Sequence, residues 1–431
     1  FNIAKYAEEQ ILDIINSIFS PFEGLVEKVR EFINTVKEQL ILVKQKLDKA
    51  YKDAVDYLSL IVAKGIEIAT SVAMISEEIE DAQDDFEFYL VSLEDHIQKI
   101  QELINSLPSS LTNDLSAVLS KLQDIKNGAQ NFQNQITNLL SNPATMVWNT
   151  AKTGMEEAIY LTIYLGKSAS LIDQAINTDP EGGGVEEVQN KIGGILENIG
   201  GGINSFANSI THFVKTSYIF SEFAPNEMIA FIEKNFPGLI DYDPCQAIGQ
   251  LSRNILEQFG IGGGFSYGVT NCSIRDALSQ TPSIPTFKEA VSDAENKIEG
   301  IPDEIGEIYN SNLASISQKK DEALRILEAL ITQNIAQLET LNKLTQIKGH
   351  VVGGIEQVEE GLNGFLARAE GIIESIKKLV DEADEMRKIG KESVQVVLQD
   401  ISEVINQIKI AVEKIQEKAN DFASYMSQNC R

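Results

Sequence analysis

Cysteine, histidine and basic residues are scarce in this sequence, and each shortage excludes a class of protein. Only three cysteines occur in 431 residues, which excludes a scaffold held together by many disulfides. The three histidines, His96, His212 and His350, are scattered, so we expect no transition-metal site and no cofactor. Lysine plus arginine number 36 against 64 acidic residues, a formal charge of −28. That charge repels phosphate backbones, so no nucleic-acid partner is expected.

Long apolar runs are also missing. A spanning helix needs about 20 predominantly apolar residues, whereas charged or amide side chains interrupt each apolar run here. We therefore predict no transmembrane segment in the soluble form. The chain begins at Phe1 without an initiator methionine, which is typical of a chain whose targeting peptide has been removed and equally of numbering that starts at a chosen boundary. A secreted, extracellular protein is our expectation.

Amphipathic helices dominate what is present. A short amphipathic segment covers 3–19, and the run Ser20 to Glu23, with Pro21 at the first helical position, predicts a helix start. Apolar residues then recur every three or four positions, which predicts one helix over 21–106, with a possible kink near Gly65. At 1.5 Å per residue such a helix is about 130 Å long. It therefore needs partner helices.

The C-terminal part of the chain has a heptad pattern. Its two seams contain mainly apolar side chains: Val394, Ile401, Ile408, Ile415 and Phe422 on one, and Val397, Val404, Ala411 and Tyr425 on the other, with Lys418 as an intruder. A further helical stretch over 302–380 contains glycines at 349, 353, 354, 361 and 364, which mark a kink or a close helix crossing.

These seams cannot stay exposed in a soluble monomer, because each apolar side chain gains about 1.5 to 3 kcal/mol on burial. We predict that the 21–106 and C-terminal helices pack lengthwise within one chain. Val404 and Ile408 should be buried, and Lys409 and Glu413 exposed. Short turns at 108, 142 and 302 would reverse the chain between helices.

The centre of the chain is rich in glycine and poor in charge. After predicted helices over 112–140 and 143–176 comes a helix with apolar side chains at helical spacing: Ile192, Ile195, Ile199, Ile203, Phe206, Ile210 and Phe213. Glycines at 193, 194, 200, 201 and 202 cost helix stability, about 1 kcal/mol each. Two interpretations stay open: close packing against neighbouring helices, or a metastable element that leaves the bundle and enters lipid or another apolar surface.

The predicted fold class is therefore all-α: an elongated antiparallel helical bundle or coiled coil with a glycine-rich apolar central module. Residues 1–140 would form an N-terminal long-helix arm and 141–285 the central module. Residues 286–431 would form a C-terminal long-helix arm that packs with the N-terminal one.

Three motifs resemble catalytic or ligand-binding signatures without their required context. Residues 264–268 match the G-x-S-x-G nucleophile elbow, but no strand precedes Ser266 and only His350 follows. Gly166, Lys167 and Ser168 lack the upstream glycine of a phosphate-binding loop. Residues 177–188 resemble a calcium loop that ends in valine instead of glutamate. We expect no enzyme activity, and a hydrolase remains a third class of function.

The cysteines suggest one disulfide. Cys245 and Cys272 flank a glycine-rich segment and are predicted to be bonded, whereas Cys430 is a free or intermolecular thiol. Asn271 begins an N-glycosylation triplet.

Two functions fit this sequence. The leading hypothesis is a non-enzymatic secreted helical-bundle protein that acts through helix-helix self-assembly, as a homo-oligomer, or by binding apolar or lipid material. The alternative is a helical pore-forming or membrane-disrupting protein that uses the 185–214 region.

Overall fold

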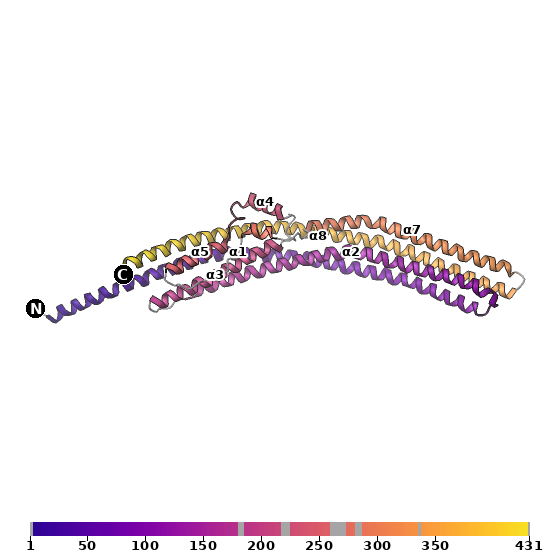
Figure 1. Cartoon of the computed structure of the whole chain (residues 1–431), viewed down its shortest axis with the longest axis horizontal. Helices are drawn as coiled ribbons and strands as arrows, with labels where there is room; N and C mark the ends of the chain where they lie inside the picture. Colours follow the sequence, from indigo (N-terminus) through magenta and orange to yellow (C-terminus); the bar gives the residue numbers. More distant parts are fainter. Residues whose placement is uncertain are drawn as a thin grey trace. The chain divides into compact units, whose positions relative to one another are not determined.

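The fold is an all-α helical bundle (Figure 1). The computed structural model describes residues 3–179, 185–216, 225–258, 273–280, 287–334 and 338–429, and no strand occurs within them. The helices are α1 (Ile3–Ile104), α2 (Ser109–Asn177), α3 (Val185–Thr216), α4 (Pro225–Asn235), α5 (Pro244–Gln258), α6 (Ile274–Ser279), α7 (Phe287–Gln333) and α8 (Leu338–Asn429). The predicted fold class is confirmed.

Three prolines lie inside helices, and this corrects the predicted helix starts. Pro21 is within α1, Pro143 within α2 and Pro302 within α7, so the turns predicted at 142 and 302 are wrong. A proline in a helix interior costs about 3 kcal/mol. In α2 and α7 the buried apolar seam runs on through the proline, since Ala144 and Ile305 are buried beyond it, and that packing offsets the cost.

Two other breaks between helices, one between α1 and α2 and one between α7 and α8, can be compared with the predictions. The turn predicted at Pro108 is confirmed, because α1 ends at Ile104 and α2 begins at Ser109, with the amide of Leu107 donating to the carbonyl of Ile104 at 3.0 Å. The helical stretch predicted over 302–380 is divided between α7, which ends at Gln333, and α8, which begins at Leu338.

Two compact units share the long helices. The first unit contains Phe1–Ala63, Thr153–Phe287 and Arg387–Arg431, and the second contains Lys64–Lys152 and Lys288–Met386. Each unit therefore joins segments that are far apart in the sequence, because antiparallel helices bring distant residues together. The units cut across the three consecutive segments expected from the sequence.

In the second unit, one aromatic ring from each of four helices joins a cluster in which three phenylalanines are buried and Tyr309 is half-buried. Phe86 of α1 lies 5.6 Å from Phe365 of α8 between ring centroids and 6.4 Å from Phe132 of α2. Tyr309 of α7 lies 6.2 Å from Phe132. These tilted and edge-on arrangements add about 0.5 to 1.5 kcal/mol per pair to the burial itself. The cluster holds the four helices at one level.

Glycines of α8 allow a close crossing with α1 in the same unit. A Cβ atom on Gly354 would lie 2.9 Å from Leu93, and one on Gly361 would lie 2.8 Å from Tyr89. At Gly361 the near atoms include the Cγ and Cβ of Tyr89, which leave no room for a side chain, whereas at Gly354 the near atom is the flexible end of Leu93. The close helix crossing predicted from these glycines is therefore confirmed at both positions, whereas Gly349 and Gly364 face open space.

In the first unit, α1 and α8 pack lengthwise and antiparallel. Lys46 contacts Glu403 at 2.7 Å, and Lys418, the intruder in the heptad seam, contacts Glu31 at 3.2 Å. Val404 and Ile408 are 0% and 1% exposed, while Lys409 and Glu413 are exposed. The predicted pairing of these helices and the predicted burial of the seam are confirmed.

Candidate functional site

The apolar element predicted in the centre of the chain is part of the core of the first unit. The side chains that the structure describes are all buried: Ile192, Ile195, Ile199, Phe206 and Phe213. The side chains of Ile203 and Ile210 lie outside the described residues. The structure thus gives α3 the packing role. Whether α3 leaves the bundle stays a prediction.

One glycine of α3 brings it close to α2. A Cβ atom on Gly202 would lie 3.3 Å from the Cβ atom of Leu171 and 3.6 Å from the backbone nitrogen of Ile172. Gly194 and Gly201 have nothing within 4 Å of such an atom. Close packing therefore explains the glycine at 202, and the structure gives no account of the other two.

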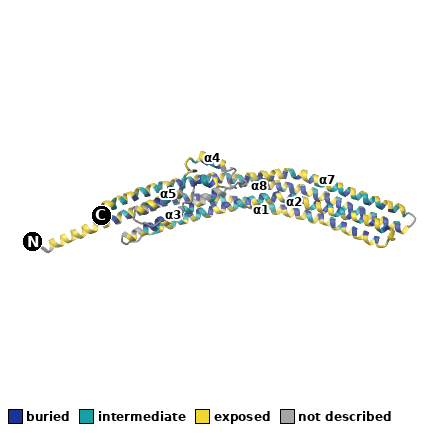
Figure 2. Cartoon of the chain, in the orientation of Figure 1, coloured by how far each residue is buried: buried dark blue, intermediate teal, exposed yellow. Residues whose placement is uncertain are grey.

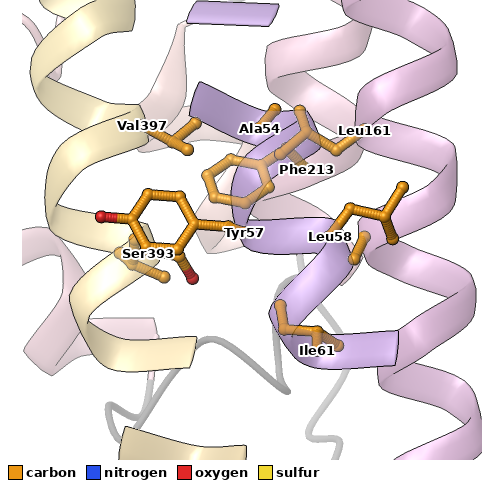
Figure 3. Close-up of a pocket in the computed structure, with 10 residues that line it drawn as sticks. Ala54, Tyr57, Leu58, Ile61, Leu161, Phe213, Ser393 and Val397 are labelled. Carbon is orange, nitrogen blue, oxygen red and sulfur yellow. The ribbon is translucent and has the colours of Figure 1, made fainter. Parts of the chain in front are cut away.

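A small cavity lies beside α3, lined by side chains of α1, α2, α3 and α8 (Figure 3). Tyr57 and Ser393 provide its polar atoms, and Phe213 and Val397 are among its apolar walls. Its volume is about 10 Å³, which is room for one water molecule. Burial raises the pKa of the Tyr57 hydroxyl, with further contributions from Asp53, Glu392 and Asp400. The cavity cannot hold an organic substrate or a lipid chain in this state.

A pair of carboxyl groups lies near this cavity, where α1 faces α8. Asp400 is 2% exposed; its Oδ1 accepts a hydrogen bond from Lys49, and its Oδ2 is buried and has no hydrogen-bond donor among the described residues. Burial first, and then the hydrogen bond to Asp53, raises the pKa of Asp400 to about 6. The pKa of Asp53 is lowered by Asp400 and by Lys49, which contacts it at 3.2 Å. Below about pH 6 Asp400 carries the proton of the pair.

The histidines occupy two unrelated places. In the second unit the Nδ1 atoms of His96 and His350 are 3.0 Å apart, and burial, followed by the His350 ring, lowers the pKa of His96. In the first unit His212 lies between Tyr160 and Tyr164, with ring centroids 5.6 and 5.4 Å away, and burial lowers its pKa. The described residues contain no cluster of three metal-binding side chains.

Several sequence motifs fall outside the described residues. These are the elbow-like motif at 264–268, the middle of the calcium-like loop, Asn271, Cys272 and Cys430. The Cys245–Cys272 disulfide therefore stays a prediction. Gly166, Lys167 and Ser168 lie on α2, where the Ser168 hydroxyl donates to the Tyr164 carbonyl at 2.9 Å in an ordinary helical contact.

The most unusual surface of the first unit is the N-terminal end of α1. Gly24 faces the hydroxyl of Tyr425, and α8 ends one turn later at Asn429. Helix α1 continues in the other direction to Ile3, past the end of its partner (Figure 1). Every residue from 5 to 20 is exposed (Figure 2). We call residues 5–22 the N-terminal extension.

The N-terminal extension has a wide apolar face. Ile11 and Ile18 are 57% and 55% exposed, against 5% for Leu25 at the point where the bundle begins. At 100° per residue the large apolar side chains cover roughly half of the helix circumference. They are Ile11, Leu12, Ile14, Ile15, Ile18, Phe19 and Phe22. Leu25 and Val29 of the buried seam project from the same side, so this face continues the core seam beyond its partner helices.

Other exposed apolar side chains of the described residues are more scattered. They are Tyr6, Val26, Ile41, Leu42, Tyr51, Leu60, Ile66, Met74, Phe88, Val91, Ile159, Tyr160, Ile163 and Leu338. Single exposed apolar residues are normal on soluble proteins, whereas a contiguous face marks an interaction site. The sequence had indicated an amphipathic segment over 3–19, but not its exposure. The exposure of residues 5–20 shows that none of the described helices covers it.

Helix α1 also contains an 18-residue window that is long and apolar enough to cross a membrane by composition, with a mean hydropathy of 1.7. Of that window, 22% is buried. A bundle helix with one apolar side passes the same test, so composition alone does not identify a span.

Comparisons with known proteins give little. No protein-family model and no curated protein matches the sequence. Among solved structures, the chain is similar to the haptoglobin-hemoglobin receptor of Trypanosoma congolense, at 9% identity, over 83% of this chain and 94% of that chain, with a TM-score of 0.20. That likeness carries no argument about function.

Proposed function

We propose that this protein is non-catalytic and acts by helix-helix association through the apolar face of the N-terminal extension. One observation carries the proposal: the face continues the core seam of α1 where no described helix of the chain covers it. A seam pattern maintained over five further turns, about 18 residues at 3.6 per turn, fits a surface that packs against another apolar surface.

The energy available from this face is moderate. Ile11, Ile14, Ile18 and Phe22 are each more than half exposed. Since full burial of such a side chain gains about 1.5 to 3 kcal/mol, covering the exposed half gains roughly 1 kcal/mol each. Seven side chains together supply several kcal/mol, which must exceed the cost of association, at least about 4 kcal/mol. We expect association of moderate strength that depends on protein concentration.

Charge favours a protein partner over lipid. Helices that lie on membranes have polar faces rich in lysine and arginine. The N-terminal extension has Lys5 as its single basic residue against Glu8, Glu9 and Asp13. Acidic side chains are repelled by anionic headgroups. The extracellular location expected from the sequence is consistent with this proposal and does not depend on it.

The proposal is tested with a variant that changes only the exposed face. Replacing Ile11, Ile15 and Ile18 together with serine should leave the thermal midpoint of the bundle unchanged, because all three side chains are exposed. Association should be lost, measured by sedimentation velocity over a concentration series, and flotation with phosphatidylcholine vesicles tests the competing lipid partner. A control variant with alanine at Asn16, Ser17 and Ser20, on the polar face, should associate like the native chain. If native and triple-serine proteins behave alike in both assays, the proposed function is wrong.

A further inference from the structure

We infer that the partner of the N-terminal extension is a second copy of this chain, whose own extension packs against it antiparallel. The inference rests on the proposed function and names the partner for the same surface. Two extensions of equal length that run in opposite directions cover each other from end to end.

The start of the bundle disfavours a parallel pair. Leu25 and Val29 are 5% and 8% exposed, so the seam of α1 is already covered there by its own chain. A parallel pair would bring two bundles to the same end of the paired extensions, where both seams are occupied. An antiparallel pair places the bundles at opposite ends.

The distribution of charge also selects the antiparallel arrangement. Residues 14–22 carry no charge, and all charged residues of the N-terminal extension lie within 5–13. Antiparallel pairing places the charged half of one copy against the uncharged half of the other. Glu8, which borders the apolar face, would lie about 18 Å along the helix from Glu8 of the second copy, at 1.5 Å per residue. That separation exceeds the Debye length of about 8 Å at physiological salt. A parallel pair would place the two Glu8 side chains opposite each other.

One pair of oppositely charged residues, Lys5 of one copy and Glu23 of the other, makes the antiparallel arrangement testable. Lys5 and Glu23 are separated by 18 residues, five helical turns, so both project from the same flank of the apolar face. In an antiparallel pair, equivalent flanking positions of the two helices face each other. Lys5 of each copy then faces Glu23 of the other, twice by symmetry. In a parallel pair each flank faces the opposite flank of the second copy, so Lys5 and Glu23 do not meet.

The size of the surface suits a modest dimer. The exposed halves of seven large apolar side chains from each of two copies amount to an interface on the order of 1,000 Å², near the lower limit for a specific complex. A weak or moderate dimer is the expected state, and its dissociation constant is measurable by sedimentation equilibrium.

The experiment compares four full-length chains by sedimentation equilibrium: the native chain, Lys5→Glu, the double variant Lys5→Glu with Glu23→Lys, and the triple-serine variant. We expect a native dimer, about tenfold weaker association for Lys5→Glu, and recovery to within about threefold for the double variant, since the ion pairs are restored in reverse. The triple-serine variant should be monomeric.

Each of the other possible results overturns one stated part of the inference or of the proposed function. Equal association of the native chain and Lys5→Glu, or failure of the double variant to recover, overturns the antiparallel arrangement. A native chain that is monomeric at all concentrations overturns the second copy as partner. If that monomer also floats with vesicles, the face binds lipid and the proposed helix-helix association is overturned as well. A dimer that survives the triple-serine change overturns the proposed function itself.

Discussion

Replacing Asp400 with asparagine should stabilise the protein at neutral pH, although it removes a partner of Lys49. The Asp400 carboxyl is 2% exposed, and burial raises its pKa to about 6 from an ordinary value of 3.8. At about 1.4 kcal/mol per pKa unit, ionising this group in the folded chain costs about 3 kcal/mol more than in the unfolded chain. Asparagine avoids that cost and can still donate to Asp53 and accept from Lys49.

The pH dependence has a definite sign. The pKa of Asp400 is higher in the folded state than in the unfolded one, so its contribution to stability is complete below about pH 4 and is lost as the pH rises to about 6. The native chain should therefore lose stability over that range relative to Asp400→Asn, and the difference should stay constant above it. Urea unfolding followed by circular dichroism at several pH values measures this difference.

A neighbouring ion pair supplies the control. Glu403, one turn away, contacts Lys46 at 2.7 Å, and this contact lowers its pKa. Because its side chain is 39% exposed, Glu403→Gln should cost no more than about 1 kcal/mol. If Asp400→Asn is instead destabilised at pH 7 by more than Glu403→Gln, the ionised Asp400–Lys49 pair is net stabilising and the reasoning is refuted.

Two further predictions concern packing. Ile408→Asp puts an unpaired charge at a position that is 1% exposed, so it should lower the unfolding free energy by about 3 kcal/mol or more, and an unchanged thermal midpoint would contradict the buried seam. Gly361→Ala should cost about 1 to 3 kcal/mol because its Cβ would lie 2.8 Å from Tyr89. Gly364→Ala, with nothing within 4 Å, should instead stabilise by up to about 1 kcal/mol, so equal effects in urea unfolding would rule out the close crossing.

Periodicity was enough to predict much of this fold. The heptad residues Val404 and Ile408 are buried as expected, since an apolar seam on a long helix has to be covered. The helix boundaries at prolines were wrong for a physical reason. A proline signal is local, whereas Pro143 and Pro302 lie in helices whose seams pack over their whole length. The free-energy cost of the proline in the helix interior is then smaller than the free energy gained by burying an uninterrupted apolar seam.

The candidate surface was harder to predict, because it depends on where partner helices end. The amphipathic pattern of 3–19 is visible in the sequence, but a covered face and an uncovered one have the same pattern. Phe22 belongs to the seam by spacing and is 55% exposed. Similarly, Asp400 follows the seam residue Val397 by three positions, and nothing in its neighbours indicates that it is buried.

The N-terminal extension should be ordered by association. An isolated helix of about 18 residues is marginally stable in water, because most helical stability in proteins comes from packing of an apolar face. Pro21 also removes one backbone hydrogen bond at the junction with the bundle.

In the monomer, amides of residues 5–20 should therefore exchange with solvent far faster than those of 25–60, whose seam is buried. At concentrations where the chains pair, exchange of 5–20 should slow in proportion to the paired fraction, while 25–60 stays unchanged. Hydrogen exchange with mass spectrometry at two concentrations measures both segments in one experiment. The triple-serine variant should show no slowing at either concentration. Protection of 5–20 that is already complete in dilute monomer would mean that the extension is covered by its own chain, and the face would then have no free surface for a partner.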